Sequence, residues 1–118
     1  MQDDVAIHAL SALAHPGRLA VCRLLVKAGE AGLAAGEVAR LMETPANTMS
    51  TQLAILARTG LIRSRRESRS IIYQADYDRF AGLLGFLVED CCGGRPEVCA
   101  PLVTMVQSAS GCSAGRPA

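Results

Sequence analysis

The hydrophobic period of the chain changes at Gly60, and this change limits the folds that the sequence can adopt. Before Gly60, the side chains Met49, Leu53 and Leu56 recur at the spacing of one buried helix face. After it, residues 61–66 and 70–74 are β-branched or alternate between apolar and polar, and the polar residues 67–69 separate them. The sequence therefore predicts a helix that is followed directly by a β-hairpin.

Shorter helical patterns lie on both sides of this pair. Apolar residues at helical spacing predict helices over residues 4–14, from Pro16 to the glycines at 29 and 32, and over 36–42. For the helix that carries Met49, we expect Thr44 as N-cap, Pro45 at the first position and Gly60 as C-cap. We expect Asp76 to cap a last long helix, whose apolar stripe over 80–88 is wider than one small core needs.

The composition favours one small helical domain. The chain has 118 residues, of which 50% are hydrophobic and only 3% aromatic, so the core is aliphatic and modest in size. We expect a domain over residues 1–107 and a flexible tail over 108–118. The acidic first residues do not resemble a secretory signal, and no apolar run reaches the ~20 residues of a membrane span. The sequence therefore predicts a cytoplasmic protein that has no membrane partner.

The charge is concentrated beside the hairpin. The net charge is only +1, yet residues 58–69 contain five arginines and one glutamate. A basic hairpin after two short helices is the order of a winged helix-turn-helix, which binds double-stranded DNA. The arginines could instead form a solvated strand face that has no partner. The polar side chains of the preceding helix could likewise be ordinary surface residues. The predicted DNA contacts are Asn47, Thr48, Ser50, Thr51, Gln52, Arg58, Arg65, Arg66 and Arg69.

Three motifs carry a family resemblance. Residues 9–19 resemble the opening motif of the ArsR/SmtB family of metal-responsive repressors, residues 48–62 its recognition helix and residues 65–73 its wing. The resemblance implies a mainly α winged helix-turn-helix with a β-hairpin wing, a homodimer formed by the first and last long helices, and release from operator DNA when an inducer binds. His15, Gly17 and Gln52 depart from the family's pattern. The cysteine pair that many members carry on the third helix is absent from residues 34–39.

The five cysteines divide into three groups. Cys22 lies on an apolar helix face and is expected in the core, and Cys112 lies in the Gly/Ser-rich tail. Cys91, Cys92 and Cys99 flank a segment in which two glycines and Pro96 end the helix, so the chain can turn back and bring three thiolates together. Thiolates select soft ions, and three sulfurs without a fourth ligand suit As(III) or Sb(III). This arrangement resembles that of the cysteines in some arsenic repressors of the family. The resemblance implies that the protein controls an arsenic-resistance operon.

Other interpretations of the cysteine cluster remain open. The three thiols could be unconnected surface groups, a redox or sulfur-responsive switch, or a site for a soft divalent ion such as Cd(II) or Pb(II). An enzyme is not expected. Only three residues separate Cys91 from Arg95, whereas the oxyanion loop of a phosphatase or an arsenate reductase needs five. We therefore expect no catalytic residues and no catalytic cofactor.

Overall fold

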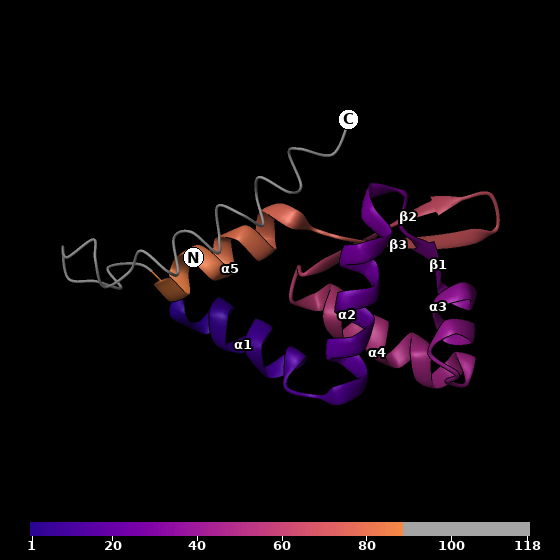
Figure 1. The fold of residues 1–118 in the computed structure, drawn as a ribbon, viewed down its shortest axis with the longest axis horizontal. Coiled ribbons are helices and arrows are strands. Elements are labelled where there is room, and N and C mark those ends of the chain that lie inside the picture. Colours follow the sequence, from indigo (N-terminus) through magenta and orange to yellow (C-terminus); the bar gives the residue numbers. More distant parts are fainter. Residues whose placement is uncertain (89–118) are drawn as a thin grey trace. The chain divides into compact units, whose positions relative to one another are not determined.

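The computed structural model describes residues 1–88 (Figure 1). Residues 1–83 form one compact unit, and a second unit begins at Leu84, of which only the end of the last helix is described. The elements are α1 (Asp3–Leu13), α2 (Pro16–Ala28), the 3₁₀ turn η1 (Gly29–Ala31), β1 (Leu33–Ala34), α3 (Ala35–Leu41), α4 (Ala46–Arg58), β2 (Ile62–Glu67), β3 (Ser70–Ala75) and α5 (Tyr77–Val88). All the helices predicted within residues 1–88 and the hairpin are therefore present.

Aliphatic side chains from α2, α3 and α4 form the centre of the core. Leu25, Val38, Leu53 and Leu56 are fully buried there, and Ile62 from β2 packs with them. The helix face predicted from the period of Met49, Leu53 and Leu56 is confirmed. Because β2 joins this core at its first residue, the hairpin starts from a fixed point beside α4.

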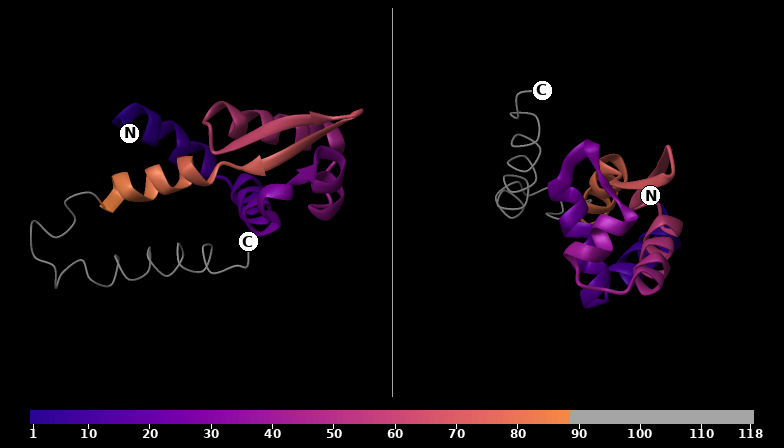
Figure 2. Two further views of the ribbon diagram at one scale, coloured as in Figure 1. Left: turned by 90° about the horizontal axis from the view of Figure 1, so that it is seen from above. Right: turned by 90° about the vertical axis from the view of Figure 1, so that its right-hand side faces the viewer.

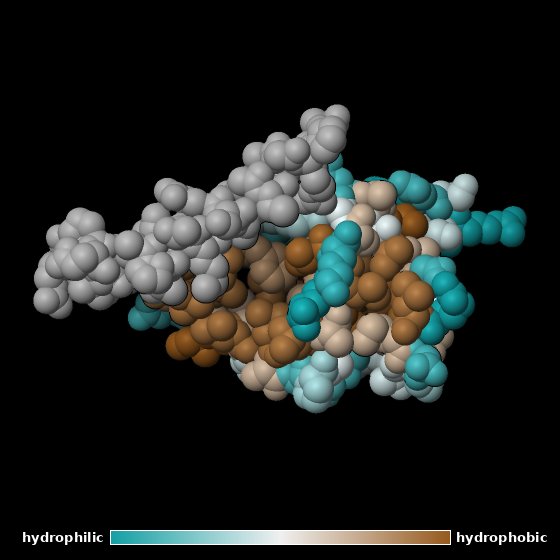
Figure 3. Space-filling model, viewed as in Figure 1, coloured by the Kyte–Doolittle hydropathy of each residue, from teal (hydrophilic) through white to brown (hydrophobic). Residues whose placement is uncertain are grey.

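Helix α1 buries a different face from the one that its large side chains suggest. Ala6, Ala9 and Ala12 are buried, whereas Ile7 is 61% and Leu10 is 40% exposed. Only alanines fit on the buried face, which indicates that α1 lies close against its neighbours. The larger apolar residues therefore remain on the surface of the described chain (Figure 3).

The helix ends differ in detail from the predictions. Thr44 is not the N-cap of α4, because Pro45 holds that position and the Thr44 hydroxyl donates to the Met42 carbonyl at 3.0 Å. Gly60 lies one residue beyond the C-cap, which is Thr59, and has φ +83°. An added Cβ at Gly60 would meet only the far end of the flexible Arg79 side chain, so it is the positive φ that favours glycine at this position.

The sheet has three antiparallel strands in the order β1-β3-β2 (Figure 2). Glu67 pairs with Ser70, so the turn contains only Ser68 and Arg69, and Glu67 belongs to β2 rather than to the predicted turn. Strand β1 was not predicted, and its two residues pair with Tyr73 and Ile72 of β3. The hairpin is therefore held at Ile62, where β2 joins the core, and along the middle of β3, where β1 pairs with it. It projects beyond α2 and α4 (Figure 1).

The predicted cap of the last helix is confirmed. The backbone N–H of Arg79 donates to Oδ1 of Asp76 at 3.1 Å. Leu83 is buried, whereas Leu84 and Leu87 are 46% and 52% exposed. No single helix among residues 1–88 is long and apolar enough to span a membrane; only α1 and α2 together, bent by 100°, reach that length and composition.

Candidate nucleic-acid interface

The side of α4 opposite the core is polar and exposed. Asn47, Thr48, Ser50 and Thr51 all lie there with exposed side chains. Oδ1 of Asn47 accepts a hydrogen bond from the N–H of Thr48 at 2.9 Å, and the Thr51 hydroxyl donates to the Asn47 carbonyl at 3.2 Å. The Asn47 amide NH₂ group and the acceptor sites of the hydroxyl oxygens are not used in these bonds. These side chains can therefore approach the base edges in a major groove.

Gln52 differs from the other predicted contacts on α4, because it is half-buried and already has a protein partner. Nη1 of Arg18 donates to Oε1 of Gln52 at 3.0 Å. Nε of the same arginine donates to the Ala12 carbonyl at 2.6 Å. Arg18 was not among the predicted residues, because 34 residues separate it from Gln52 and no local pattern connects them.

Arg58 lies in the last turn of α4 with an exposed side chain. It lines a pocket of about 480 Å³ whose other polar lining residues are His8, Ser11, Arg18 and Thr59. No acidic residue lines this pocket. A surface that carries Arg18 and Arg58 without a carboxylate favours anions, such as the phosphates of DNA.

The predicted wing arginines do not all have the same environment. The Arg65 guanidinium is held by the chain itself: Nε donates to Glu67 Oε2 at 2.7 Å, Nη2 donates to the Ala31 carbonyl at 2.7 Å, and Nη1 donates to the Glu30 carbonyl and to Gln74 Oε1. These bonds connect the hairpin to η1. Arg65 therefore holds the wing against the body of the unit.

Arg66 and Arg69 are exposed and have no ion pair within residues 1–88. Because side chains alternate along a strand, Arg66 points to the opposite face of the hairpin from Arg65. Arg69 lies in the two-residue turn at the tip, a region of the surface that is strongly hydrophilic (Figure 3). Both guanidinium groups are therefore available for a phosphate or a minor groove.

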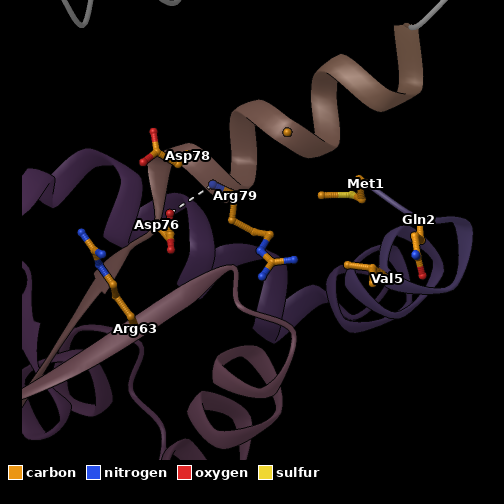
Figure 4. A pocket seen from close by; sticks show the side chains of 8 residues that line it. Met1, Gln2, Val5, Arg63, Asp76, Asp78 and Arg79 are labelled. Atoms are coloured by element: carbon orange, nitrogen blue, oxygen red, sulfur yellow. Dashed lines mark hydrogen bonds between the residues drawn. The ribbon is translucent and has the colours of Figure 1, made fainter.

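The fifth arginine of the basic segment, Arg63, lines a different pocket. This pocket has a volume of about 460 Å³ and lies between the start of α1, β2 and the start of α5 (Figure 4). Asp76, Asp78 and Arg79 also line it, so its charges balance. It therefore lacks the positive charge of the surface around Arg58.

The predicted inducer site lies outside the described residues. This applies to Cys91, Cys92 and Cys99, and also to Cys112. The core position predicted for Cys22 is confirmed: the residue is 2% exposed, and burial raises the pKa of its thiol to about 11. Within residues 1–88, no three His, Cys, Asp or Glu side chains come together in a way that could hold a metal ion.

Comparisons with known sequences agree with this geometry. A family described as a helix-turn-helix domain matches residues 13–65. The biofilm growth-associated repressor of Agrobacterium fabrum is 35% identical over 89 residues, which are 75% of this chain and 73% of the repressor. The HTH-type transcriptional regulator YgaV of Escherichia coli is 31% identical over 83 residues, which are 70% of this chain and 82% of YgaV. These relatives are regulators of transcription, which confirms the prediction that the chain is not an enzyme.

Comparison with solved structures confirms the fold. The homodimeric winged helix-turn-helix DNA-binding domain of Mb0332 from Mycobacterium bovis, described as a possible ArsR-family regulator, superposes with a TM-score of 0.59. It is 24% identical, and the match covers 80% of this chain and 94% of that domain. The predicted mainly α winged helix-turn-helix with a β-hairpin wing is therefore confirmed. From its fold and its relatives, this chain belongs to the family of winged helix-turn-helix transcriptional regulators that includes the biofilm growth-associated repressor and YgaV.

Proposed function

We propose that the protein is a homodimeric, cytoplasmic repressor of an arsenic-resistance operon that leaves its operator when As(III) or Sb(III) binds Cys91, Cys92 and Cys99. One observation carries the proposal: the sequence places a cluster of three cysteines directly after a folded DNA-binding unit. In such a chain, the binding of a soft ion to the cysteines can change the affinity of the neighbouring unit for DNA.

The surface of α4 and the wing supports the DNA half of the proposal. Asn47, Thr48, Ser50, Thr51 and Gln52 approach the base edges in the major groove. Arg58, Arg66 and Arg69 contact phosphates, or the minor groove at the tip of the wing. Arg65 acts by holding the wing in place through its bonds to η1, Glu67 and Gln74.

The chemistry of thiolates supports the sensor half. Sulfur ligands select soft ions, and three of them satisfy a three-coordinate As(III) or Sb(III) ion. Both histidines of the chain lie far upstream, at positions 8 and 15, so no imidazole in the neighbouring sequence supplies the fourth ligand of a zinc site. A typical coupling free energy of ~1–3 kcal/mol between two sites weakens DNA binding by roughly 5- to 150-fold.

Operator release tests the sensor site. We expect Cys99→Ser to bind operator DNA as the wild type does but to lose release by arsenite. Cys112→Ser removes a thiol outside the proposed cluster and serves as the matched control, so it should be released normally. Fluorescence anisotropy of a labelled operator measures both variants. Normal release of Cys99→Ser contradicts the three-cysteine site.

The same assay separates the alternative inducers. Titration with As(III), Sb(III), Cd(II), Pb(II), Zn(II) and an oxidant is carried out on the reduced wild-type protein. Release by As(III) or Sb(III) at the lowest concentrations supports the proposal. Release by the oxidant alone assigns a thiol redox switch, and release by Cd(II) or Pb(II) alone assigns a divalent metal sensor.

The salt dependence of DNA binding tests the wing. The affinity for DNA falls as salt rises, and each phosphate contact that is lost makes the slope of log K against log[salt] less steep by about 0.9. We expect Arg66→Ala to make this plot less steep by about 0.9, which corresponds to one phosphate contact. The melting temperature should stay unchanged, because Arg66 has no ion pair within residues 1–88 that the substitution would break. Arg65→Ala should instead lower the melting temperature, since it breaks the bonds to Glu30 and Ala31. An unchanged slope for Arg66→Ala removes this arginine from the DNA contacts.

A further inference from the structure

We propose that Arg18 is a positioning residue that turns the amide of Gln52, so that its NH₂ group is the part offered to DNA. The inference rests on the proposed DNA-binding role of α4. It assigns a specificity-determining function to a residue of α2, outside α4 and the wing, where all the predicted DNA contacts lie.

The chemistry of the two side chains fixes the orientation of the amide. An arginine guanidinium carries only donors, so the atom of Gln52 that faces it must be the carbonyl oxygen Oε1. Nη1 of Arg18 lies 3.0 Å from this oxygen. The Nε2 group, on the other branch of the same amide, is thereby turned away from Arg18.

Arg18 is itself held in place. Nε donates to the carbonyl of Ala12, one of the last carbonyls of α1, which have no partner inside their own helix. The N–H of Arg18 donates to Nδ1 of His15, the N-cap of α2, at 3.3 Å. These two bonds hold Arg18 in place at the junction of α1 and α2. The bond from Nε alone is enough to satisfy the Ala12 carbonyl. The additional bond to Gln52 is not needed for that purpose.

The position of Gln52 gives this bond a consequence for recognition. Gln52 is half-buried on α4, next in sequence to the exposed Thr51. A free glutamine can present its oxygen and its NH₂ group together, which is the arrangement that reads adenine. With Oε1 turned toward Arg18, the side chain presents donors only. Donors match the O6 and N7 atoms of guanine or the O4 atom of thymine.

The preferred operator sequence provides the test. Full-length wild-type protein selects its preferred duplexes from a library with a randomised segment, and the relative affinity for each base is then measured. Gln52→Glu keeps an acceptor for Arg18 but replaces the NH₂ group with a second acceptor oxygen. We expect the preference at one position of each half-site to change from guanine or thymine to cytosine or adenine, by roughly 10-fold. An unchanged preference in Gln52→Glu overturns the inference.

Arg18→Met removes the donors and keeps much of the side-chain length. We expect it to weaken the preference at the same position by roughly 3- to 10-fold, while preferences elsewhere in the half-site stay. The matched control is Arg23→Met, which changes an exposed arginine of the same helix and should keep the wild-type preference. Loss of affinity in Arg18→Met that is uniform across all sequences overturns the positioning role. If the wild type selects no preferred sequence, the proposed function itself is wrong. The wild-type experiment alone shows this outcome, so it is distinct from a failure of the inference about Arg18.

Discussion

His15 and Gly17 depart together from the family's pattern, and the structure shows why they form a pair. Nδ1 of His15 accepts hydrogen bonds from the N–H groups of Gly17 and Arg18, so the imidazole acts as the N-cap of α2, a position that aspartate, asparagine, serine or threonine more often occupies. A Cβ at residue 17 would lie 3.1 Å from Cε1 of His15, which is closer than ordinary van der Waals contact. Glycine at 17 therefore makes room for the larger cap at 15.

Cys22 gives a prediction about the pH dependence of stability. Burial raises the pKa of its thiol from 9.0 to about 11, so the unfolded chain loses this proton at lower pH than the folded chain does. The contribution of Cys22 to stability is fully present below pH 9 and is lost as the pH rises to about 11. We expect Cys22→Ala to be less sensitive to pH over this interval, measured by urea unfolding at pH 8, 9, 10 and 11.

The comparison between Cys22→Ala and the wild type isolates the thiol, because every other ionisable group is the same in both proteins. The wild type should lose more free energy of unfolding between pH 9 and 11 than the variant does. Parallel curves would show that the thiol of Cys22 titrates equally in the folded and unfolded chains. Removal of the sulfur from the core should also lower the stability of the variant below pH 9.

Single residues were predictable from the sequence where local spacing determines their environment. Cys22 and Leu53 follow a helical period, which gives their burial directly. The bond between Arg18 and Gln52 and the bond between Arg65 and the Ala31 carbonyl each join residues 34 positions apart, and only the folded chain brings these partners together. Local spacing therefore predicted which residues of α4 and the hairpin are polar, but not which of them, such as Gln52 and Arg65, are bonded to distant parts of the chain.

At the scale of elements, the helices were predicted better than the sheet. Each helix carries several apolar residues at one period, whereas β1 has only Leu33 and Ala34 and is too short for any period. Its existence depends on η1 and on pairing with β3, neither of which leaves a local pattern. The Thr44 cap was predicted wrongly because a threonine before a proline is typical of an N-cap, while here the chain enters α4 through Pro45 itself.

Two glycines near β1 give a matched prediction for this part of the sheet. At Gly32, which has φ +68°, an added Cβ would lie 2.4 Å from the Tyr73 carbonyl of β3. At Gly36, in α3, nothing lies within 4 Å of an added Cβ. We expect Gly32→Ala to lower the free energy of unfolding by about 1–3 kcal/mol or more, because the strained backbone and the close β1–β3 contact must both give way.

Gly36→Ala should have the opposite effect and raise the free energy of unfolding. Alanine fits the helical backbone at this position and restricts the unfolded chain, so we expect a gain of about 0.4–1 kcal/mol. Urea unfolding followed by circular dichroism measures both variants. A Gly32→Ala protein as stable as the wild type would show that β1 is not held against β3 as the structure describes.

At the scale of the whole molecule, the arrangement of α1 supports a dimer. The large apolar residues Ile7 and Leu10 of α1 do not face the core of their own unit, because the small residues Ala6, Ala9 and Ala12 occupy that side. Ile7 and Leu10 are left on the surface, one helical turn apart. A modest aliphatic core that leaves large apolar residues outside gains stability when a second copy covers them.

The oligomeric state tests this arrangement. If α1 lies in the interface of the proposed homodimer, Leu10→Glu should give a monomer of 12.4 kDa in sedimentation experiments, because a charge would be buried in that interface. Leu41→Glu is the control: Leu41 is 45% exposed, similar to Leu10, but it lies on α3. Since the two recognition helices of a dimer bind two half-sites at a fixed spacing, the Leu10→Glu monomer should also lose operator affinity. A Leu10→Glu protein that keeps the mass and the affinity of the wild type would exclude α1 from the interface, and the exposed stripe would then need another occupant.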